Sequence, residues 1–345
     1  MSRWAAVLAG GSGTRFWPLS TSRSPKQLLP LAGTKSLLAQ SVDRLAGLIP
    51  PDRVLVITGA ALRDATLHAL PEVPPANVLA EPRAASTGPA LVWATQVAAS
   101  RDAGASVLAL HADWFVGDDE AFRRTAGRAL DVAEQQDVLV TVGVVPTRPD
   151  VGYGYIMPGE PLEGDARRVS RFIEKPDTER ATKLIGEGAL WNSGLFAWTA
   201  KRFAEETQAL APEIAPHVPL LAKNDVAGFF AAVRPIAIDV SHFERSRRVA
   251  VLPGRFPWDD VGTWTALARV HPRDAAGNTL VGDVVATQSS DVVAWGGDGP
   301  VVLYGVKDLV VVRANGIVFV TTAERAPHLK ELLHGLPDRL RDPAP

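Results

Sequence analysis

The chain has 345 residues, of which 46% are hydrophobic and 21% charged, and its formal net charge is −2. These values are ordinary for a packed protein and argue against a disordered chain, and the length suits one large domain with a smaller one. The nearly neutral charge excludes a global basic field that would recruit nucleic acid or an anionic membrane. Because the sequence has no cysteine, disulfides, cysteine-ligated zinc and a thiol nucleophile are excluded.

The N-terminal apolar run is short, from Trp4 to Ala9, and Arg3 is the basic residue before it. A secretory signal needs a longer apolar region, and a membrane-spanning helix needs about 18 or more apolar residues in a row. No such run occurs elsewhere in the sequence. We therefore expect a soluble protein of the cytoplasm.

In the first half of the chain, short apolar runs alternate with longer helical patterns. Apolar runs without polar alternation are typical of strands that are buried on both faces. Their alternation with helices predicts a mostly parallel, doubly wound sheet, in which ligands bind beyond the carboxyl ends of the strands. The expected strands are Trp4–Ala9, Arg53–Thr58, Asn77–Ala80, Ser106–Leu110 and Val138–Val144, and the expected helices are Ser36–Ala46, Gly88–Ser100 and Glu120–Gln135.

The middle of the chain has a different pattern of expected strands and helices, which predicts an insertion that closes one side of this sheet. Strands are expected at Arg167–Glu174 and Asn192–Trp198, and helices near Asp177–Glu187 and Pro212–Ala232. These segments still belong to the first domain, for which we expect residues 1–270.

The last part of the chain, residues 271–345, is expected to form a second, β-rich domain. From Thr279 to Thr322 the sequence is rich in valine and is interrupted by turn signals such as Gly296-Gly297 and Asn315-Gly316. This pattern predicts many short strands. A terminal helix is expected from about Ala326 to Leu333.

The first expected strand leads into a glycine-rich loop, Gly10-Gly11-Ser12-Gly13-Thr14-Arg15. Glycine lets backbone N–H groups approach a phosphate because no Cβ intervenes. A dinucleotide-binding loop would need a third glycine where Phe16 stands, and a Walker A loop would end in Gly-Lys-Ser/Thr. Both common nucleotide loops fail on these details, which leaves a triphosphate loop or a plain turn. Arg15 can supply one cation, and Lys26 can supply a second.

The continuation of this loop resembles a known family. The run Gly10–Ser20, with Phe16-Trp17-Pro18-Leu19-Ser20 as its more specific part, and the later Pro25-Lys26-Gln27 resemble the opening motif of the sugar-phosphate nucleotidyltransferases. Within that superfamily the chain is most similar to the mannose-1-phosphate guanylyltransferases, also called GDP-mannose pyrophosphorylases. The resemblance covers residues 1 to about 270 and, more loosely, the C-terminal part. It implies a Rossmann-like, doubly wound mixed sheet of the nucleotide-diphospho-sugar transferase type, with a short left-handed β-helix at the C-terminus that often helps to form dimers.

A second motif, Phe172-Ile173-Glu174-Lys175-Pro176, ends an expected strand. Because side chains alternate along a strand, Glu174 and Lys175 are expected on opposite faces, and Pro176 ends the ladder. A carboxylate can accept hydrogen bonds from sugar hydroxyls and an ammonium can neutralise a phosphate, although a solvated strand end has the same residues. The pentapeptide resembles the sugar-phosphate signature of the family, which implies that Lys175 contacts the phosphate and Glu174 the sugar hydroxyls.

Two further segments are implied to line the sugar site by the same resemblance. In Trp191-Asn192-Ser193-Gly194-Leu195-Phe196, Asn192 would bind the sugar and Gly194 would keep the pocket wall low. In Gly152-Tyr153-Gly154-Tyr155-Ile156, the backbone at Gly154 would line the site.

Nucleotidyl transfer also needs a divalent cation, and Mg²⁺ prefers one or two carboxylates together with phosphate oxygens and water. Asp113 follows a buried run, and Asp259 and Asp260 lie in Trp258-Asp259-Asp260-Val261-Gly262-Thr263-Trp264. Turn or capping aspartates are the alternative for each. The resemblance implies one Mg²⁺ on Asp113 and Asp260. The chain departs from the family at Trp114, where a histidine is usual.

The segment Glu81–Ala90 follows a short strand, and Ser86 or Thr87 is a plausible N-cap of the next helix. In the family this segment lies against the nucleobase, and a carboxylate at Glu81 suits the N1–H and N2–H₂ donors of guanine. The chain departs from the family here, since Ser86 stands for a usual asparagine and Gly88 for a usual alanine. The residues implied to contact the nucleotide are Leu8, Ala9, Gly10, Gly11, Ser12, Gly13, Thr14, Arg15, Lys26, Glu81, Pro82, Ser86, Thr87 and Asp113.

The resemblance implies in-line attack of mannose 1-phosphate on the α-phosphorus of GTP, with release of pyrophosphate. Arg15, Lys26 and the loop amides would stabilise the developing charge, and Lys175 would hold the acceptor phosphate. We expect a homodimer that binds no nucleic acid and no membrane. Two alternatives stay open: the same reaction with another sugar and base, such as glucose 1-phosphate with UTP or dTTP, and a non-catalytic regulatory subunit built on this fold.

Overall fold

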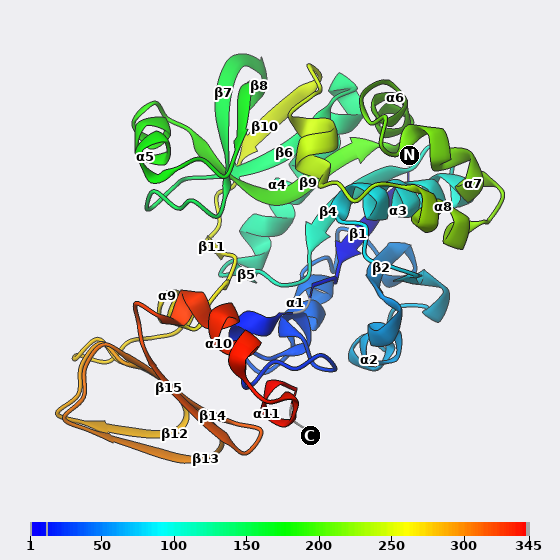
Figure 1. Ribbon diagram of the computed structural model, residues 1–345. Coiled ribbons are helices and arrows are strands. Elements are labelled where there is room, and N and C mark those ends of the chain that lie inside the picture. Colours follow the sequence, from blue (N-terminus) through cyan, green and yellow to red (C-terminus); the bar gives the residue numbers. More distant parts are fainter. Residues whose placement is uncertain (1, 12, 343–345) are drawn as a thin grey trace. The chain divides into compact units, whose positions relative to one another are not determined.

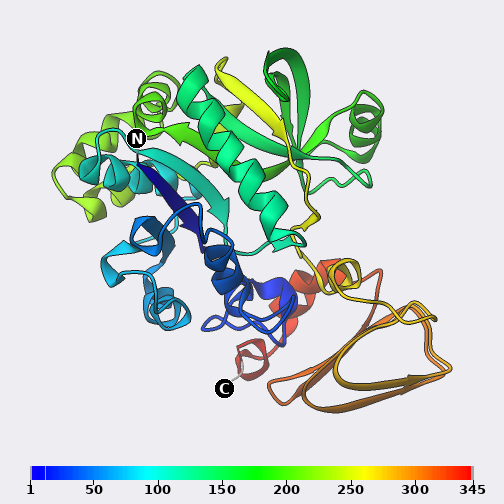
Figure 2. The same ribbon diagram turned by 180° about the vertical axis from the view of Figure 1, so that it is seen from behind.

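The structure is a computed structural model and describes residues 2–11 and 13–342 of the chain. Two compact units are distinguished within it, and both are discontinuous in sequence (Figures 1 and 2). Unit 1 comprises Met1–Gly10, Ser41–Ala112 and Asp118–Trp258, and unit 2 comprises Gly11–Gln40, Asp113–Gly117 and Asp259–Pro345. These units cut across the expected division at residue 270, because the chain that follows the first strand packs with the C-terminal part.

A nine-stranded mixed sheet forms the centre of unit 1, with the strand order β3-β2-β1-β4-β9-β6-β10-β8-β7. Strands β1 to β4 are parallel to one another, whereas β9 is antiparallel to both of its neighbours β4 and β6. The predicted Rossmann-like mixed sheet is therefore confirmed. The strands are β1 (Arg3–Leu8), β2 (Val54–Gly59), β3 (Val78–Glu81), β4 (Ser106–His111), β6 (Leu139–Val144), β7 (Gly154–Glu163), β8 (Ala166–Glu174), β9 (Leu190–Thr199) and β10 (Val249–Pro253).

Helices cover both faces of this sheet, as expected for strands that are apolar on both sides. Helix α4 (Asp119–Gln136) lies across one face, in front in Figure 2, and buries Phe122, Ala126 and Leu130. Helix α3 (Thr87–Arg101) packs on the opposite face together with α6 to α8 (Figure 1). The remaining helices of this unit are α2 (Arg63–Ala69), α5 (Thr178–Gly186), α6 (Ala200–Leu210), α7 (Val218–Ala222) and α8 (Val226–Ala232), while α1 (Leu37–Asp43) begins in unit 2 and ends in unit 1.

Several expected elements differ from those found. The helix predicted at Pro212–Ala232 is broken into a 3-10 turn, α7 and α8, because Asn224 adopts a left-handed φ of 58° between the two helices. Strand β7 and helix α6 were not expected. A π-helical turn at Asp239–Phe243 was not expected either, because its sequence has no periodic pattern that predicts it.

Unit 2 contains a four-stranded sheet of order β12-β13-β14-β15. Its strands are β12 (Thr279–Thr287), β13 (Val293–Tyr304), β14 (Leu309–Ala314) and β15 (Ile317–Thr322), and the first three are parallel. Parallel neighbours in sequence order are what the successive coils of a β-helix produce; its left-handedness stays a prediction. The expected terminal helix is α10 (Leu329–Gly335), preceded by a 3-10 turn; the other elements of this unit are α9 (Leu267–Val270), α11 (Asp338–Arg341) and β5 (Phe115–Val116), and β11 (Trp258–Asp259) spans the unit boundary.

The core of unit 2 joins residues of the glycine-rich region to the C-terminal strands. Phe16, Trp17 and Trp264 are buried in one cluster with Val310, Val312 and other side chains of the sheet. No helix within the described part of the chain is long and apolar enough to cross a membrane.

Candidate active site

The glycine-rich loop leaves β1 at its carboxyl end, as the sequence predicts. Gly10 and Gly11 have open space where a Cβ would lie, so that a ligand could approach their backbone. Gly13 is different, because its φ is +57° and a Cβ there would lie 2.3 Å from the backbone nitrogen of Lys26. Gly13 therefore allows the Lys26 backbone to pack against the loop. The predicted contact residue Ser12 lies outside the described residues.

The bulky residues after the loop anchor it in the core of unit 2. Phe16 is fully buried and meets Trp264 edge to face, with the ring centroids 5.1 Å apart. The indole N–H of Trp264 donates to the Trp17 carbonyl at 2.9 Å, and the indole of Trp17 donates to the Leu340 carbonyl at 2.8 Å. The Phe-Trp-Pro run therefore serves packing, which explains why a bulky ring stands where a dinucleotide loop has glycine.

Lys26 joins the two predicted metal ligands of unit 2. Its Nζ lies 2.9 Å from Asp113 Oδ2 and donates to the backbone carbonyl of Asp260 at 2.5 Å. The Lys26 side chain is only 7% exposed, whereas that of Asp113 is 35% exposed. The ammonium that the sequence assigns to the triphosphate is thus also the group that holds Asp113 beside Asp260.

The two aspartates of the Asp-Asp pair have separate surroundings. Asp259 is buried and forms a two-pronged ion pair with Arg269, at 2.5 and 2.9 Å, while also accepting from the Val261 N–H at 2.8 Å. Val261 is fully buried with a φ of +44°, which is rare for a β-branched residue. Asp259 therefore holds this strained turn, which distinguishes its role from that predicted for Asp260.

The residues around Lys26 include two carboxylates that could hold a hard cation. Asp113 Oδ2 lies 2.9 Å from Lys26 Nζ, whereas Asp260 contacts this ammonium through its backbone carbonyl. Mg²⁺ usually takes no more than one or two carboxylates from a protein. A Cβ on Gly262 would lie 2.6 Å from Asp260 Oδ2 and 3.4 Å from Arg15 Nη1. The Asp260 carboxylate and the exposed Arg15 guanidinium therefore border the same backbone position. No group of three or more acidic, histidine or cysteine side chains within residues 2–11 and 13–342 forms a metal cage.

In unit 1, Glu174 and Lys175 lie together and not on opposite faces, so that expectation was wrong. Glu174 ends β8, but Lys175 has left the strand with a φ of +46°, and its Nζ lies 3.0 Å from Glu174 Oε1. The left-handed conformation reverses the side-chain alternation on which the prediction depended. The Lys175 side chain remains 63% exposed, so its ammonium is accessible to an anionic ligand.

The other predicted sugar-site residues gather around Glu174. A Cβ on Gly154 would lie 2.6 Å from Glu174 Oε2 and 3.4 Å from the Asn192 Cβ, so Gly154 makes room for both side chains. Gly194 has a φ of +77°, and its N–H donates to Asn192 Oδ1 at 3.2 Å. The structure therefore brings together the predicted residues Gly154, Glu174, Lys175, Asn192 and Gly194.

Two acidic residues of this neighbourhood were missed from the sequence. Asp239 accepts a hydrogen bond from Asn192 Nδ2 at 2.7 Å, and burial, followed by the charge of Glu174, raises its pKa to about 6. The pKa of Glu244 is also raised, first by burial and then by Glu174. Both lie 65 or more residues after Glu174 in a segment without a recognisable motif, so spacing alone gave no signal.

The segment expected to face the base begins at the end of β3, where Glu81 lies. Burial raises the pKa of Glu81 to about 7. Its Oε1 is inaccessible to solvent and has no hydrogen-bond partner among the described residues. A buried carboxylate oxygen without a donor is costly, so this is a position that a ligand with N–H donors would satisfy.

The start of α3 is held differently from the expected cap. Ser86 occupies the N-cap position with a φ of +67° but makes no capping hydrogen bond through its side chain. Thr87 Oγ1 instead accepts from the Ile238 N–H at 2.9 Å. A Cβ on Gly88 would lie 2.7 Å from the Ile236 carbonyl, whose oxygen accepts from the Gly88 N–H at 3.0 Å. The close approach of these backbones favours glycine at position 88.

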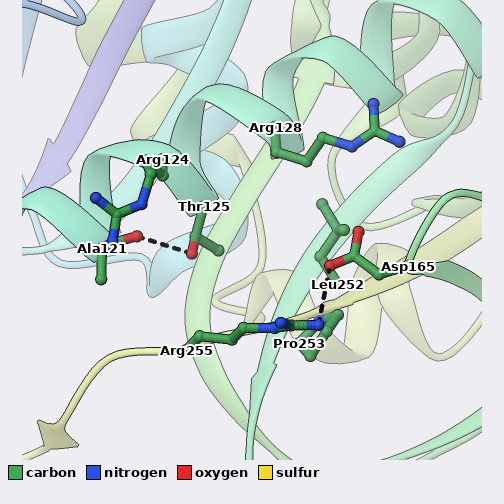
Figure 3. Close-up of a pocket in the computed structure, with 8 residues that line it drawn as sticks. All are labelled: Ala121, Arg124, Thr125, Arg128, Asp165, Leu252, Pro253 and Arg255. Atoms are coloured by element: carbon green, nitrogen blue, oxygen red, sulfur yellow. Dashed lines mark hydrogen bonds and ion pairs between the residues drawn. The ribbon is translucent and has the colours of Figure 1, made fainter.

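A separate pocket of about 390 Å³ lies beside α4 and the end of β10 (Figure 3). None of the predicted site residues lines it. Its arginines already face carboxylates, so they are not an unused phosphate site. The pairs are Arg124–Glu120 at 2.5 Å, Arg128–Glu163 at 3.0 Å and Arg255–Asp165 at 3.8 Å.

Comparison with known proteins adds family information to these sites. Residues 4–277 match the model of the nucleotidyl transferase family. The chain is similar to the mannose-1-phosphate guanylyltransferase of Escherichia coli K12, with 33% identity over 96% of this chain and 72% of the relative. It is also similar to the xanthan biosynthesis protein XanB of Xanthomonas campestris pv. campestris, with 34% identity over 95% of this chain and 72% of the relative.

A solved structure shares the fold of this chain over almost the whole length of both. It is described as mannose-1-phosphate geranyltransferase from Thermus thermophilus, and it has 36% identity, a TM-score of 0.91, and coverage of 97% of this chain and 99% of that one. The family model matches well over half of the chain, and the mixed α/β sheet agrees with it. The chain is therefore a member of the nucleotidyl transferase family.

Proposed function

We propose that the protein is a mannose-1-phosphate guanylyltransferase, which converts GTP and α-D-mannose 1-phosphate to GDP-mannose and pyrophosphate. The names of its relatives support this reaction, since the Escherichia coli relative is a mannose-1-phosphate guanylyltransferase. The observation that carries the proposal is the cluster of Lys26, Asp113 and Asp260 in unit 2, in which the Lys26 backbone packs against Gly13 of the glycine-rich loop. An ammonium that pairs with one carboxylate and binds the backbone carbonyl of a second acidic residue is a suitable receptor for a metal-bound triphosphate.

In unit 2, the proposed roles follow from these contacts. Asp113 and Asp260 would hold Mg²⁺, which when bound spreads the negative charge of the triphosphate. Lys26 keeps Asp113 in place through their ion pair and supplies positive charge beside it. Arg15 is exposed and borders the same backbone position as the Asp260 carboxylate, which supports the proposal that its guanidinium stabilises the charge on the leaving pyrophosphate.

In unit 1, the proposed roles concern the acceptor. Lys175 is exposed and would bind the phosphate of mannose 1-phosphate, whose oxygen attacks the α-phosphorus of GTP. That oxygen is already anionic near pH 7, so the attack needs no general base. Glu174 and Asn192 lie next to each other at Gly154 and would bind the sugar hydroxyls.

Guanine is the base that best suits Glu81. Guanine presents N1–H and N2–H₂ as adjacent donors, and Glu81 has a buried oxygen without a described partner. Uracil and thymine have a single ring N–H between carbonyl oxygens, which would face the carboxylate unfavourably. Pro82, Ser86 and Thr87 stay predicted contacts of the nucleotide, together with Leu8 and Ala9 at the end of β1.

A screen of substrate pairs tests the reaction. The purified protein is incubated with Mg²⁺, one of GTP, ATP, UTP or dTTP, and mannose 1-phosphate or glucose 1-phosphate, and pyrophosphate release is measured. We expect GTP with mannose 1-phosphate to give the highest kcat/KM. A higher value for glucose 1-phosphate with UTP or dTTP would favour the alternative specificity, and no turnover with any pair would favour a non-catalytic regulatory subunit.

We also propose that the protein is a homodimer, and its cytoplasmic location stays a prediction. The proposed dimer is supported by large apolar side chains that are exposed on the C-terminal sheet, including Val302 at 74% and Tyr304 at 69%. Such patches commonly mark surfaces that another protein covers. Sedimentation analysis tests the dimer, since a monomeric mass over micromolar concentrations would contradict it.

A further inference from the structure

A hydrogen-bond network lies behind the proposed sugar-site residues of unit 1 and depends on Asp239. This residue begins the π-helical turn Asp239–Phe243. Its carboxylate oxygen Oδ1 accepts from Asn192 Nδ2 at 2.7 Å, across 47 residues of sequence. The preceding residue, Ile238, donates its N–H to Thr87 Oγ1 at the start of α3, so the turn is tied to a helix of the sheet. The position of Asp239 is therefore fixed by a contact with α3, which is not one of the sugar-site segments.

The partners of Asn192 determine how its amide group is oriented. A carboxamide has two N–H donors on nitrogen and two acceptor positions on oxygen. The oxygen Oδ1 accepts from Gly194 N–H at 3.2 Å and from Thr141 Oγ1 at 3.0 Å. A backbone N–H can only donate and a carboxylate can only accept, so Gly194 and Asp239 together exclude the flipped amide. This conclusion does not depend on the Thr141 hydroxyl, which can rotate.

The same count shows what Asn192 can offer a ligand. Both acceptor positions on Oδ1 and one N–H on Nδ2 are used by the protein. Across residues 2–11 and 13–342, no other group accepts from the second N–H. Asn192 can therefore act towards a substrate only as a single hydrogen-bond donor.

We propose that Asp239 is a positioning residue which locks Asn192 as a donor, so that the site recognises one sugar hydroxyl as a hydrogen-bond acceptor. This proposal rests on the proposed function and deepens it. Glu174, an acceptor when ionised, lies against the same glycine, Gly154, as Asn192. The pair therefore suits two hydroxyls of one sugar, of which one accepts from Asn192 and the other donates to Glu174.

The proposal is tested by a double-mutant cycle between Asp239→Ala and Asn192→Ala. KM and kcat are measured from pyrophosphate release, with mannose 1-phosphate varied at saturating GTP and GTP varied at saturating mannose 1-phosphate. We expect Asp239→Ala to raise the KM for the sugar phosphate by about tenfold or more, since a hydrogen bond in a protected site is lost. The KM for GTP should stay within about twofold. If Asp239 acts through Asn192, the double variant will be no worse than Asn192→Ala alone.

Analogues of the sugar phosphate supply a readout that a purely structural role would not move. A fluorine keeps weak acceptor capacity, whereas a deoxy position has none. For the hydroxyl that contacts Asn192, the wild-type protein should prefer the monofluoro over the monodeoxy analogue. In Asp239→Ala this preference should fall to within about twofold, because Asn192 Nδ2 loses the carboxylate that accepts from it. Asp239→Leu is similar in size, removes both carboxylate oxygens, and carries the test if the alanine variant fails to fold.

A matched control is Thr95→Val, which removes a buried hydrogen bond from the indole of Trp198 at 3.1 Å in the same unit. It should lower the melting temperature without changing the KM for the sugar phosphate. The proposal is overturned if Asp239→Ala leaves that KM within twofold, raises both KM values equally, or adds its effect to that of Asn192→Ala. If the substrate screen selects another sugar phosphate, the double-mutant cycle is run with that compound. Failure of the proposed reaction can then be distinguished from failure of the proposed role of Asp239.

Discussion

Replacing Glu81 by glutamine should make the ligand-free protein more stable at pH 8 and a poorer binder of GTP. Burial raises the pKa of Glu81 from 4.5 to about 7. The folded protein therefore retains a proton on Glu81 at pH values where the unfolded chain has lost it. The stability contributed by this group is fully present below pH 4.5 and is lost as the pH rises through about 7.

The size of the effect follows from the same values. A pKa raised from 4.5 to about 7 corresponds to about 3 kcal/mol against the ionised folded form. Because Glu81 is only partly buried, solvent screening reduces this to about 1–2 kcal/mol. Glutamine has nearly the same shape and no charge, so Glu81→Gln should add about 1–2 kcal/mol to the free energy of unfolding at pH 8 and close to nothing at pH 5.

The measurement is urea unfolding followed by circular dichroism at pH 5 and pH 8, without nucleotide. In parallel, the KM for GTP should rise about tenfold or more, because charge-assisted hydrogen bonds to the guanine donors are lost. A Glu81→Gln protein that is no more stable at pH 8, or that gains equally at pH 5, would refute the assignment of a buried, destabilised carboxylate. An unchanged KM for GTP with the expected gain in stability would refute only its role in base recognition.

Three further outcomes are expected. Gly13→Ala should lose about 2–4 kcal/mol of stability, because its Cβ would lie 2.3 Å from the Lys26 backbone nitrogen and the residue has a left-handed conformation. Gly10→Ala, where the space for a Cβ is open, should have the melting temperature of the wild type in calorimetry. Asp260→Asn and Lys175→Ala should each lower kcat about a hundredfold or more without lowering the melting temperature. The control variant Asp259→Asn should instead lower the melting temperature and leave kcat within about threefold. Near wild-type turnover in the first two variants would contradict the site. EDTA should abolish pyrophosphate release and added Mg²⁺ should restore it, and full activity in EDTA would exclude the proposed metal.

Much of the site could be predicted because its residues follow strands at recognisable points. Gly10 to Arg15 directly follow β1, and Glu174 and Lys175 end or follow β8, so motif order along the chain was informative. Their detailed geometry was not predictable. The left-handed conformation of Lys175 turned a pair expected on opposite faces into an ion pair, and such a conformation depends on packing around the strand end.

The sequence by itself determined the apolar strands, the alternation with helices and the glycine-rich loop, because these depend on local hydrophobicity and on residues without a Cβ. Only the tertiary structure decided which distant groups meet. It placed Asp239 on Asn192 and joined Phe16 and Trp17 to the C-terminal strands. It also placed the Lys26 ammonium against the Asp113 carboxylate and the Asp260 backbone carbonyl. Contacts across tens or hundreds of residues arise from packing and leave no periodic trace in the sequence.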